Sequence, residues 1–338
     1  MPCTNLRHPE ERPGGARLEG RASALPRRPS GWQFIDLAEL GRNTGRSYVA
    51  TLLRIILYPL AAAVLLGLAV ALGTVVFHPQ PGSLDPIVGI LIQYGLIVVA
   101  GFAVLHSVER SHRRPWRSLV APDLSIDWRR LAIGGGVQFA ILGGELALVH
   151  ALTGWPWRFA ISAGLPLFLL AVLLIPLQSA SEELLFRGYL TQVLGRIVRS
   201  RIVIATTVGL VFGLLHLNTY GPLTLPYFLV LSLIFSLVAL RDDRLELAIG
   251  GHGAMNLFAF GVANAALVEP AVVGAGDGAM PFNWAAIVAL VANGALFYGT
   301  TRLLVRIFCA PRSAPGTRMP VVRPSRRRLP AAPQDDVS

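Results

Sequence analysis

The stretch AGLPLFLLAVLLIPLQSASEELLFRGYL, residues 163–190, decides what kind of fold this chain can have. It is long and apolar enough to cross a lipid bilayer, for which about 20 residues are needed. Two adjacent glutamates, Glu182 and Glu183, interrupt it where the helix should still lie inside the membrane. Because hydrocarbon penalises ionisable groups, such residues usually face the interior of a helix bundle or a wet cavity. The stretch therefore predicts a membrane helix with a polar function built into it.

The composition of the whole chain is that of a membrane protein. Its 338 residues have a mean hydropathy of +0.57, and 14% of them are charged, whereas soluble domains are about one-quarter charged. The net charge is +11, and all 30 basic residues are arginine. These arginines lie in tails and short loops, where they act as topology determinants. We expect no nucleic-acid binding, because that needs an exposed basic face on a folded domain.

Both ends of the chain are predicted to be disordered basic tails. They comprise residues 1–48 and 309–338, and the first is rich in Arg, Pro and Gly. Within it, the stretch from Trp32 to Leu40 could lie flat on the membrane as an interfacial helix or could simply fray. The two cysteines, Cys3 and Cys309, lie in the tails and lack the spacing of a zinc site or a disulfide framework.

Residues 49–308 form the predicted transmembrane domain, an all-α helix bundle. It contains eight apolar segments, of which the fifth and seventh are short for a membrane span. The segments cover residues 52–77, 86–106, 131–152, 163–190, 202–217, 224–240, 245–260 and 283–308. We therefore expect a polytopic bundle of about eight transmembrane helices.

The distribution of arginine predicts the orientation of this bundle. The N-terminal tail carries eight Arg residues and loop 107–130 carries six, whereas loops 78–85, 218–223 and 261–282 carry none. Basic and neutral loops alternate along the chain, as the positive-inside rule requires when both termini are cytoplasmic. The sequence thus predicts a multi-pass protein of the cell membrane, surrounded by membrane lipid.

Acidic and imidazole side chains are expected to meet inside the bundle. Segments four and five should form an antiparallel hairpin that turns near Arg199. Glu182 lies 17 residues before this turn, and His216 lies 17 residues after it. At 1.5 Å per residue, both lie about 25 Å from the turn. A carboxylate and an imidazole at one level could hold a water molecule between them and deprotonate it.

Two further pairs are spaced four residues apart and therefore share a helix face. Glu183 and Arg187 are predicted to form a buried salt bridge that orients the helix and neutralises the second carboxylate. His252 and Asn256 offer hydrogen-bond donors for a developing oxyanion. A single His or Asn inside a membrane is often only a link between helices. The joint pattern of acid, imidazole and amide favours activation of water.

Three motifs in this order resemble those of the CPBP intramembrane proteases. That superfamily includes the type II CAAX prenyl endopeptidases and the bacteriocin self-immunity proteins. The motifs are Glu182-Glu183-xxx-Arg187, Phe212-xxx-His216 and His252-xxx-Asn256. The resemblance covers roughly residues 120–305, the predicted catalytic core, and leaves both tails outside.

The resemblance implies an endopeptidase that cleaves a membrane-anchored protein or a lipidated peptide, with prenylated CAAX sequences as the implied substrate class. It implies that Glu182 is the general base that activates water, and that His216 holds this water or binds a metal. It implies that His252 and Asn256 stabilise the tetrahedral oxyanion. The residues with implied supporting roles are Glu183, Arg187 and Phe212.

The cofactor is left open by the sequence. The family is often classed as metalloproteases, and Glu182, His216 and His252 could make a zinc site with an open position. The chain has no His-Glu-x-x-His motif, and a metal-free pair of Glu and His would use the same residues. Zn²⁺ and no metal both remain consistent with the pattern.

Two other functions fit the same sequence. The protein could be a non-catalytic membrane scaffold or a bacteriocin self-immunity protein, although every motif residue is intact. It could also be a proton-coupled transporter with a relay through Glu145, Glu182 and His216, but the chain shows no obvious internal repeat. We interpret Glu145 as one partner in a hydrogen bond between helices. Gln178 and Asn293 are interpreted as packing or cavity residues.

Overall fold

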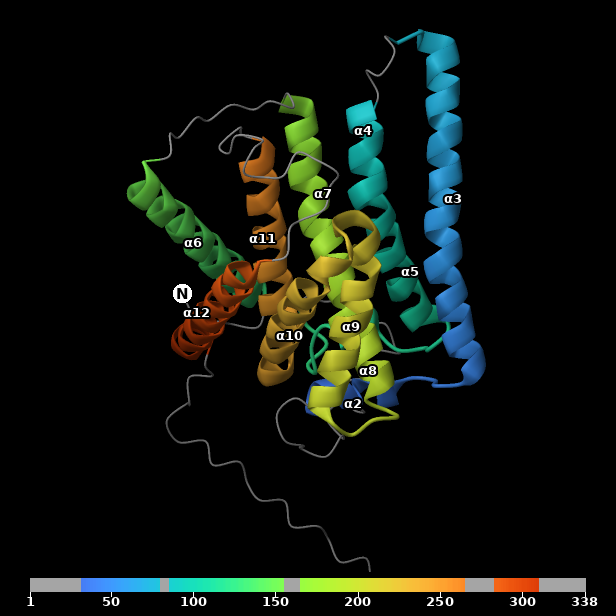
Figure 1. Cartoon of the computed structure of the whole chain (residues 1–338). Coiled ribbons are helices and arrows are strands. Elements are labelled where there is room, and N and C mark those ends of the chain that lie inside the picture. The colour runs from blue at the N-terminus through green and yellow to red at the C-terminus, as the bar shows by residue number, and fades with distance from the viewer. Residues whose placement is uncertain (1–31, 80–84, 155–164, 265–282, 310–338) are drawn as a thin grey trace, which may run out of the picture.

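The apolar segments fold into helices that pack side by side (Figure 1). The computed structural model describes residues 32–79, 85–154, 165–264 and 283–309, and every regular element in these ranges is helical. The longer helices are α3 (Gly45–Phe77), α5 (Leu96–Arg110), α6 (Trp128–Thr153), α7 (Leu165–Glu183), α9 (Arg201–Tyr220), α10 (Leu225–Asp242), α11 (Glu246–Asn264) and α12 (Trp284–Phe308). The shorter helical elements are α2 (Trp32–Asp36), η1 (Leu37–Leu40), α4 (Asp85–Ile90), η2 (Leu91–Gly95), η3 (Trp116–Leu119), η4 (Leu184–Leu190), α8 (Thr191–Leu194) and η5 (Pro222–Thr224).

Within the described ranges, six helices are long and apolar enough to cross a membrane, so the chain is an integral membrane protein. These spans are Gly45–Phe77, Val88–Arg110, Trp128–Thr153, Phe168–Leu194, Pro222–Asp242 and Trp284–Phe308. The two segments predicted to be short are also helical, as α9 and α11, but neither is among these six. The prediction of an all-α membrane protein is confirmed, whereas eight spans and two cytoplasmic termini stay predictions.

Polar residues in the connections define where several helices begin. The side chains of Thr44 and Asp127 accept hydrogen bonds from backbone N–H groups in the first turns of α3 and α6. Ser200 and Asn283 do the same for α9 and α12. Because the first N–H groups of a helix have no partner within the helix, such caps stabilise its start. These caps define the first residues of the helices, which the apolar pattern alone does not locate.

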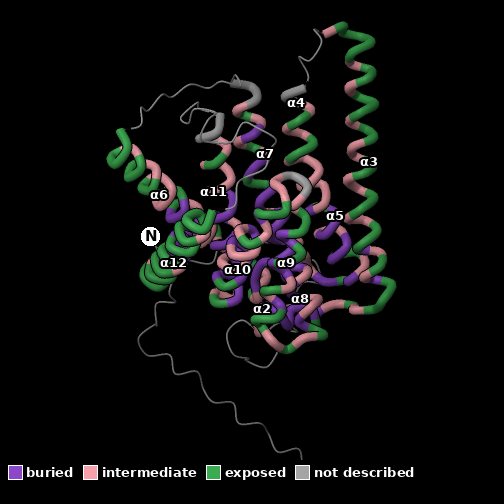
Figure 2. The backbone as a smooth tube through the Cα atoms, in the orientation of Figure 1, coloured by how far each residue is buried: buried purple, intermediate pink, exposed green. Residues whose placement is uncertain are grey.

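The helices form a continuous series of neighbours with α7 and α11 at its centre. Along this series α3 packs on α5, α5 on α7, α7 on α11, and α11 on α6. Beyond α6 the series continues with α12, which packs on both α6 and α10. Helix α10 in turn packs on α9. Figure 2 shows that buried residues gather in the half of the bundle near α2 and α8, while α3 and the far end of α6 are mostly exposed.

Glycines allow α6 and α11 to approach closely. A Cβ atom at Gly250 would collide with the backbone carbonyl oxygen of Leu131, and one at Gly134 would collide with that of Leu247. Only glycine lets two helix backbones come this near to each other. The crossing holds α11, which carries the predicted oxyanion pair, against α6.

Residues 32–48 differ from the predicted disordered tail. They form α2, η1 and the start of α3, and the side chains of Phe34, Ile35 and Leu37 are buried in the protein core. These elements pack against α8 and η3. Their apolar side chains therefore contact the protein core, whereas a position of this segment at the membrane surface stays a prediction. The rest of the predicted tails, residues 1–31 and 310–338, lies outside the described residues.

Candidate active site

Helices α7 and α11 run antiparallel and bring together most of the predicted site. Their polar side chains meet in two layers, which are separated by four residues on each helix and hence by about one helical turn. The first layer consists of Glu182, Glu183 and His252, and the second layer consists of Gln178, Ser179 and Asn256. All six residues lie in the buried part of the bundle or at its edge.

Glu183 is the centre of the first layer. Its Oε1 accepts a hydrogen bond from Arg187 Nη1 at 2.9 Å and another from His252 Nδ1 at 2.8 Å. The three side chains are at most 2% exposed. The contact with Arg187 is the one that the four-residue spacing predicted, whereas the contact with His252 was not foreseen. Because Nδ1 donates to the carboxylate, Nε2 of His252 is the nitrogen that faces the rest of the site.

Arg187 is enclosed by aromatic rings. It lies in the π-helical η4 that directly follows Glu183, and π-helical turns are frequent at functional sites. Its Cζ lies 4.7 Å from the centroid of the Phe212 ring and 5.9 Å from that of Phe235, within the range of cation–π attraction. The ring of Phe212 therefore covers the buried guanidinium, which is a structural role in addition to its place in the motif with His216.

The pair of Glu183 and Arg187 retains capacity for further hydrogen bonds. Within the described ranges, Oε2 of Glu183 and both Nε and Nη2 of Arg187 find no partner, although all three atoms are buried. Buried polar atoms are almost always bonded to protein or to ordered water. These atoms are therefore able to bond ordered water or a substrate next to a carboxylate.

Glu182 is the second carboxylate of the first layer. Its Oε2 lies 3.6 Å from His252 Nε2, which is close enough for an ion pair and too long for a direct hydrogen bond. The side chain is buried, with 8% of its surface exposed. His252 is thus one imidazole that meets this carboxylate, a contact that the counting of residues did not include.

His216 is held by contacts with its own helix and with aromatic rings. Its Nδ1 donates to the backbone carbonyl of Phe212 at 2.7 Å, and its ring stacks on Phe228 with a centroid distance of 4.3 Å. Although both residues are described, no hydrogen bond or ion pair joins His216 to Glu182. The Phe212 ring contacts both imidazoles, with centroid distances of 4.4 Å to His216 and 6.3 Å to His252. Nε2 of His216 remains able to accept a hydrogen bond.

The second layer surrounds the amide of Asn256. Nδ2 of Asn256 lies 3.1 Å from Ser179 Oγ, 3.2 Å from Gln178 Oε1 and 3.2 Å from His252 Nε2. Ser179 Oγ in turn donates to Gln178 Oε1 at 3.3 Å. We interpreted Gln178 as a packing or cavity residue from the sequence and assigned no role to Ser179. The signal that could have found them is their position, four residues before each glutamate.

The proposed zinc ligands do not converge. Among the residues that the structure describes, no three His, Cys, Asp or Glu side chains are placed to hold a metal ion. Nδ1 of His252 and Nδ1 of His216 are used in hydrogen bonds, which leaves Nε2 of each ring as the nitrogen that could bind a metal. Because these nitrogens and the Glu182 carboxylate do not come together among the described residues, they do not fit a tetrahedral zinc site as they lie here.

Glu145 lies outside both layers. Its Oε1 accepts from Asn293 Nδ2 at 3.0 Å, and Oδ1 of Asn293 accepts from Gln138 Nε2 at 3.0 Å. These bonds join α6 to α12, which agrees with the interpretation of Glu145 as a partner in a hydrogen bond between helices.

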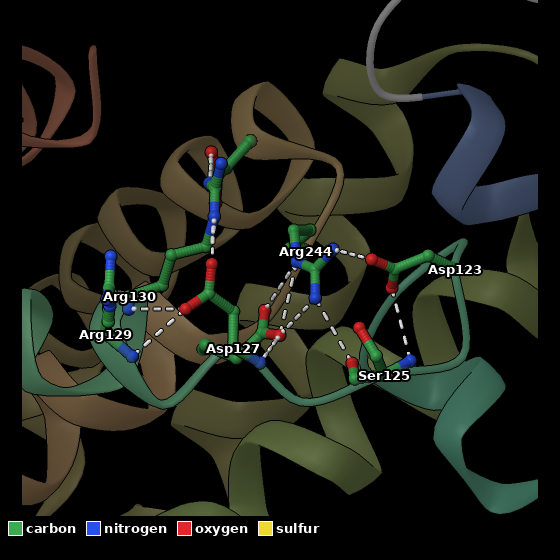
Figure 3. Close-up of polar contacts among 8 residues, drawn as sticks. Asp123, Ser125, Asp127, Arg129, Arg130 and Arg244 are labelled. Carbon is green, nitrogen blue, oxygen red and sulfur yellow. Dashed lines mark hydrogen bonds and ion pairs between the residues drawn. The ribbon is translucent and has the colours of Figure 1, made fainter. Parts of the chain in front are cut away.

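An ionic network fixes the first turn of α11 (Figure 3). Arg244 donates to Glu246 at 2.8 Å, to Asp123 at 2.7 Å and to the carbonyl of Ser125 at 3.2 Å, and the backbone N–H of Asp127 donates to Glu246 at 3.0 Å. Burial raises the pKa of the Asp123 carboxyl, but the hydrogen bond and charge of Arg244 outweigh burial and lower this pKa below its ordinary value. The loop before α6 is thereby tied to the helix that carries His252.

Comparison with known proteins agrees with this site. Residues 160–258 match the family model described as Rce1-like, Type II CAAX prenyl endopeptidase Rce1-like, and this range contains every residue of the three motifs. The chain is 26% identical over 182 residues to a protein of Bacillus subtilis (strain 168) described as uncharacterized protein YyaK, an alignment that covers 52% of this chain and 61% of that protein. No solved structure matches the chain. The chain therefore contains an Rce1-like domain of the type II CAAX prenyl endopeptidase (CPBP) family.

Proposed function

We propose that this protein is an intramembrane endopeptidase that cleaves a peptide bond in a membrane-anchored protein or a lipidated peptide. The observation that carries the proposal is the first layer, where two carboxylates flank one imidazole inside an integral membrane protein. Such a buried ionisable group is costly to keep and is rarely without function. The Rce1-like domain around it supports hydrolysis of a peptide bond, with prenylated CAAX sequences as the substrate class to test first.

Glu182 is the general base in the proposed reaction. It accepts a proton from a water molecule while the water oxygen forms a bond to the carbonyl carbon of the scissile peptide. The carbonyl π electrons move onto the carbonyl oxygen, which becomes an oxyanion. When this tetrahedral intermediate collapses, the C–N bond breaks and the leaving amine takes the proton from Glu182. The products are a carboxylic acid and an amine, and the enzyme returns to its starting state.

Asn256 and His252 stabilise the oxyanion in this proposal. Asn256 can donate from Nδ2. His252 donates to Glu183 from Nδ1, so it can donate from Nε2 only as an imidazolium. The carboxylate of Glu183 would balance that charge, in the way a buried acid stabilises the histidine of a catalytic triad. His216, whose ring contacts Phe212, would bind water or substrate through Nε2.

A test of this proposal compares the wild-type protein with Glu182→Gln, purified in detergent and mixed with a farnesylated peptide that ends in a CAAX sequence. Glutamine keeps the shape of Glu182 but cannot accept the proton, so we expect wild-type cleavage and no cleavage by the variant. Glu145→Gln is the matched control, because it removes an intramembrane carboxylate outside both layers, and it should cleave like the wild type.

The other outcomes separate the alternatives. Equal cleavage by the wild type and Glu182→Gln would remove the base assignment. No cleavage by either protein would contradict a CAAX endopeptidase and favour the scaffold or self-immunity function. A chelator arm tests for a metal: loss of cleavage that added Zn²⁺ restores would show that a metal is required. If Glu145→Gln also abolished cleavage, the result would favour a proton relay that links Glu145 to Glu182.

A further inference from the structure

The second layer repeats the arrangement of the first layer with neutral side chains. Gln178 and Ser179 precede the two glutamates by four residues on α7, and Asn256 follows His252 by four residues on α11. Since α7 and α11 run antiparallel, these equal spacings place the two layers one helical turn apart. In the first layer, Glu183 fixes the ring of His252 through one hydrogen bond. The side chains of the second layer are placed to do the same for the amide of Asn256.

The contacts of the second layer form a closed triangle. Asn256 Nδ2 donates to Ser179 Oγ at 3.1 Å and to Gln178 Oε1 at 3.2 Å, and Ser179 Oγ donates to Gln178 Oε1 at 3.3 Å. Ser179 is fully buried and Gln178 is 5% exposed. The hydroxyl hydrogen of Ser179 is used on Gln178, so its oxygen is left to accept. Two acceptors therefore converge on one nitrogen.

This convergence matters because an asparagine amide has little orientation of its own. The terminal torsion of Asn is broad and roughly two-fold, so an amide without partners would turn its oxygen toward the site as readily as its nitrogen. Acceptors at both Gln178 and Ser179 select the nitrogen. The two helices lie next to each other at this layer, because a Cβ at Gly253 would be in van der Waals contact with Cα of Pro176 at 3.7 Å and with Cβ of Ser179 at 4.0 Å.

Asn256 has two N–H hydrogens and, while His252 is neutral, three acceptors around them, the third being His252 Nε2 at 3.2 Å. A charged acceptor forms a stronger hydrogen bond than a neutral one. An oxyanion can therefore draw one N–H away from His252 while the other stays on the second layer. We infer that Gln178 and Ser179 are positioning residues, which hold the Asn256 amide so that it presents an N–H to the oxyanion. This inference rests on the proposed function.

The experiment measures kcat and KM for the farnesylated CAAX peptide in Gln178→Met and Ser179→Ala. Each change removes one acceptor and retains much of the shape, so we expect kcat to fall roughly threefold to tenfold, the effect of one neutral hydrogen bond. KM should change little, because the amide acts on the transition state. Ser179→Thr keeps the hydroxyl and should restore most of kcat. Ser181→Ala is the matched control, since the Ser181 hydroxyl bonds only the carbonyl of Leu177 in its own helix.

A double-mutant cycle separates positioning from damage to the fold. In an Asn256→Ala background there is no amide to orient, so adding Ser179→Ala or Gln178→Met should lower kcat no further. If the second change lowers kcat by the same factor as in the wild type, the residues act independently of Asn256 and the inference is wrong. It is also wrong if both single variants cleave like Ser181→Ala. Absence of cleavage by the wild type would remove the proposed function and this inference together, whereas normal cleavage with an additive cycle removes the inference alone.

Discussion

His252 Nδ1 lies 2.8 Å from Glu183 Oε1, and this bond joins the first motif to the third across two helices. The same carboxylate oxygen binds Arg187. Glu183 therefore does more than neutralise an arginine: it holds the imidazole in the orientation in which Nε2 faces Glu182 and Asn256. A supporting residue of the first motif thus sets the geometry of a proposed oxyanion donor.

Replacing either partner of the buried pair should cost both stability and activity. Glu183→Gln leaves the guanidinium of Arg187 buried without a counter-charge, and Arg187→Met does the converse. Loss of one partner of a buried ion pair typically destabilises a protein by about 3–5 kcal/mol. We expect lower membrane yield and a lower unfolding temperature in detergent for each single variant.

The double variant Glu183→Gln with Arg187→Met distinguishes the two roles of Glu183. It buries no unpaired charge, so its yield should exceed that of either single variant. Its cleavage rate should stay low, because His252 has lost its carboxylate partner. A single variant with normal yield, or a double variant that cleaves like the wild type, would contradict this account.

The crossing of α6 and α11 should be sensitive to one methyl group. In Gly250→Ala the new Cβ would meet the backbone of α6, which cannot move aside as a flexible side chain could. Overpacking of this kind costs roughly 1–3 kcal/mol, so we expect a lower unfolding temperature and weaker cleavage. Gly143→Ala, on the partner helix α6, is the control because nothing lies within 4 Å of its Cβ position. Equal behaviour of the two variants would mean that the helices do not approach closely.

Stability should fall as the pH is lowered, because His112 is buried as a neutral ring. Its Nδ1 donates to the carbonyl of Arg42 at 2.8 Å, and its Nε2 lies 3.0 Å from the Tyr189 hydroxyl. Burial lowers the pKa of His112 below its usual range, against a smaller upward effect of the bond to Arg42. The unfolded chain takes up this proton near pH about 6.5 and the folded protein only at lower pH. The unfolded state therefore binds more protons as the pH falls, and stability present above about pH 6.5 is lost below it.

The measurement is the unfolding temperature in detergent between about pH 7.5 and about pH 5.5, the range around the ordinary value for histidine. Wild type should lose stability toward the acidic end, and His112→Gln should show a shallower slope. His78→Gln, at the C-terminal end of α3, is the control histidine variant. An unchanged slope in His112→Gln would assign the pH dependence to other groups.

Local spacing predicted some contacts of the site and missed others for a physical reason. Glu183 and Arg187 lie four residues apart in one continuous helical stretch, so their contact follows from helix geometry alone. The contact between His252 and Glu183 instead joins residues 69 positions apart on two helices. It depends on how α7 packs on α11. Spacing along one helix therefore does not reveal it.

The N-terminal segment shows that local composition also fails to predict some elements of the fold. Arg, Pro and Gly dominate the composition before α3, which predicts disorder. The groups that order residues 32–40 lie far away in the sequence: Gln192 donates to the carbonyl of Phe34, and Asp243 accepts from its N–H. Six spans could be predicted because each carries its own apolar signal. Docking of a short helix depends on partners that no local pattern reveals.

The hydrogen bonds and ion pairs of Arg244 should stabilise the start of α11. Arg244 and Glu246 are 13% and 1% exposed, and Glu246 opens the helix on which His252 lies six residues later. Arg244→Gln would leave the Glu246 carboxylate buried without its cation, which is strongly destabilising for a buried pair. We expect a lower unfolding temperature and slower cleavage, because the first turn of α11 loses its tie to the loop before α6.

The control for Arg244 is Arg117→Gln, which removes an exposed arginine whose Cζ lies 5.5 Å from the centroid of the Trp116 ring. Exposed ion pairs are worth about 0–1 kcal/mol, so Asp123→Asn, with its side chain 56% exposed, should cost less than Arg244→Gln. If Arg244→Gln is as mild as these two variants, the network is a surface feature and the position of α11 depends on the glycine crossing alone. If it slows cleavage with unchanged KM, the ionic network and the crossing together hold His252 and Asn256 at the distance from α7 that the two layers require.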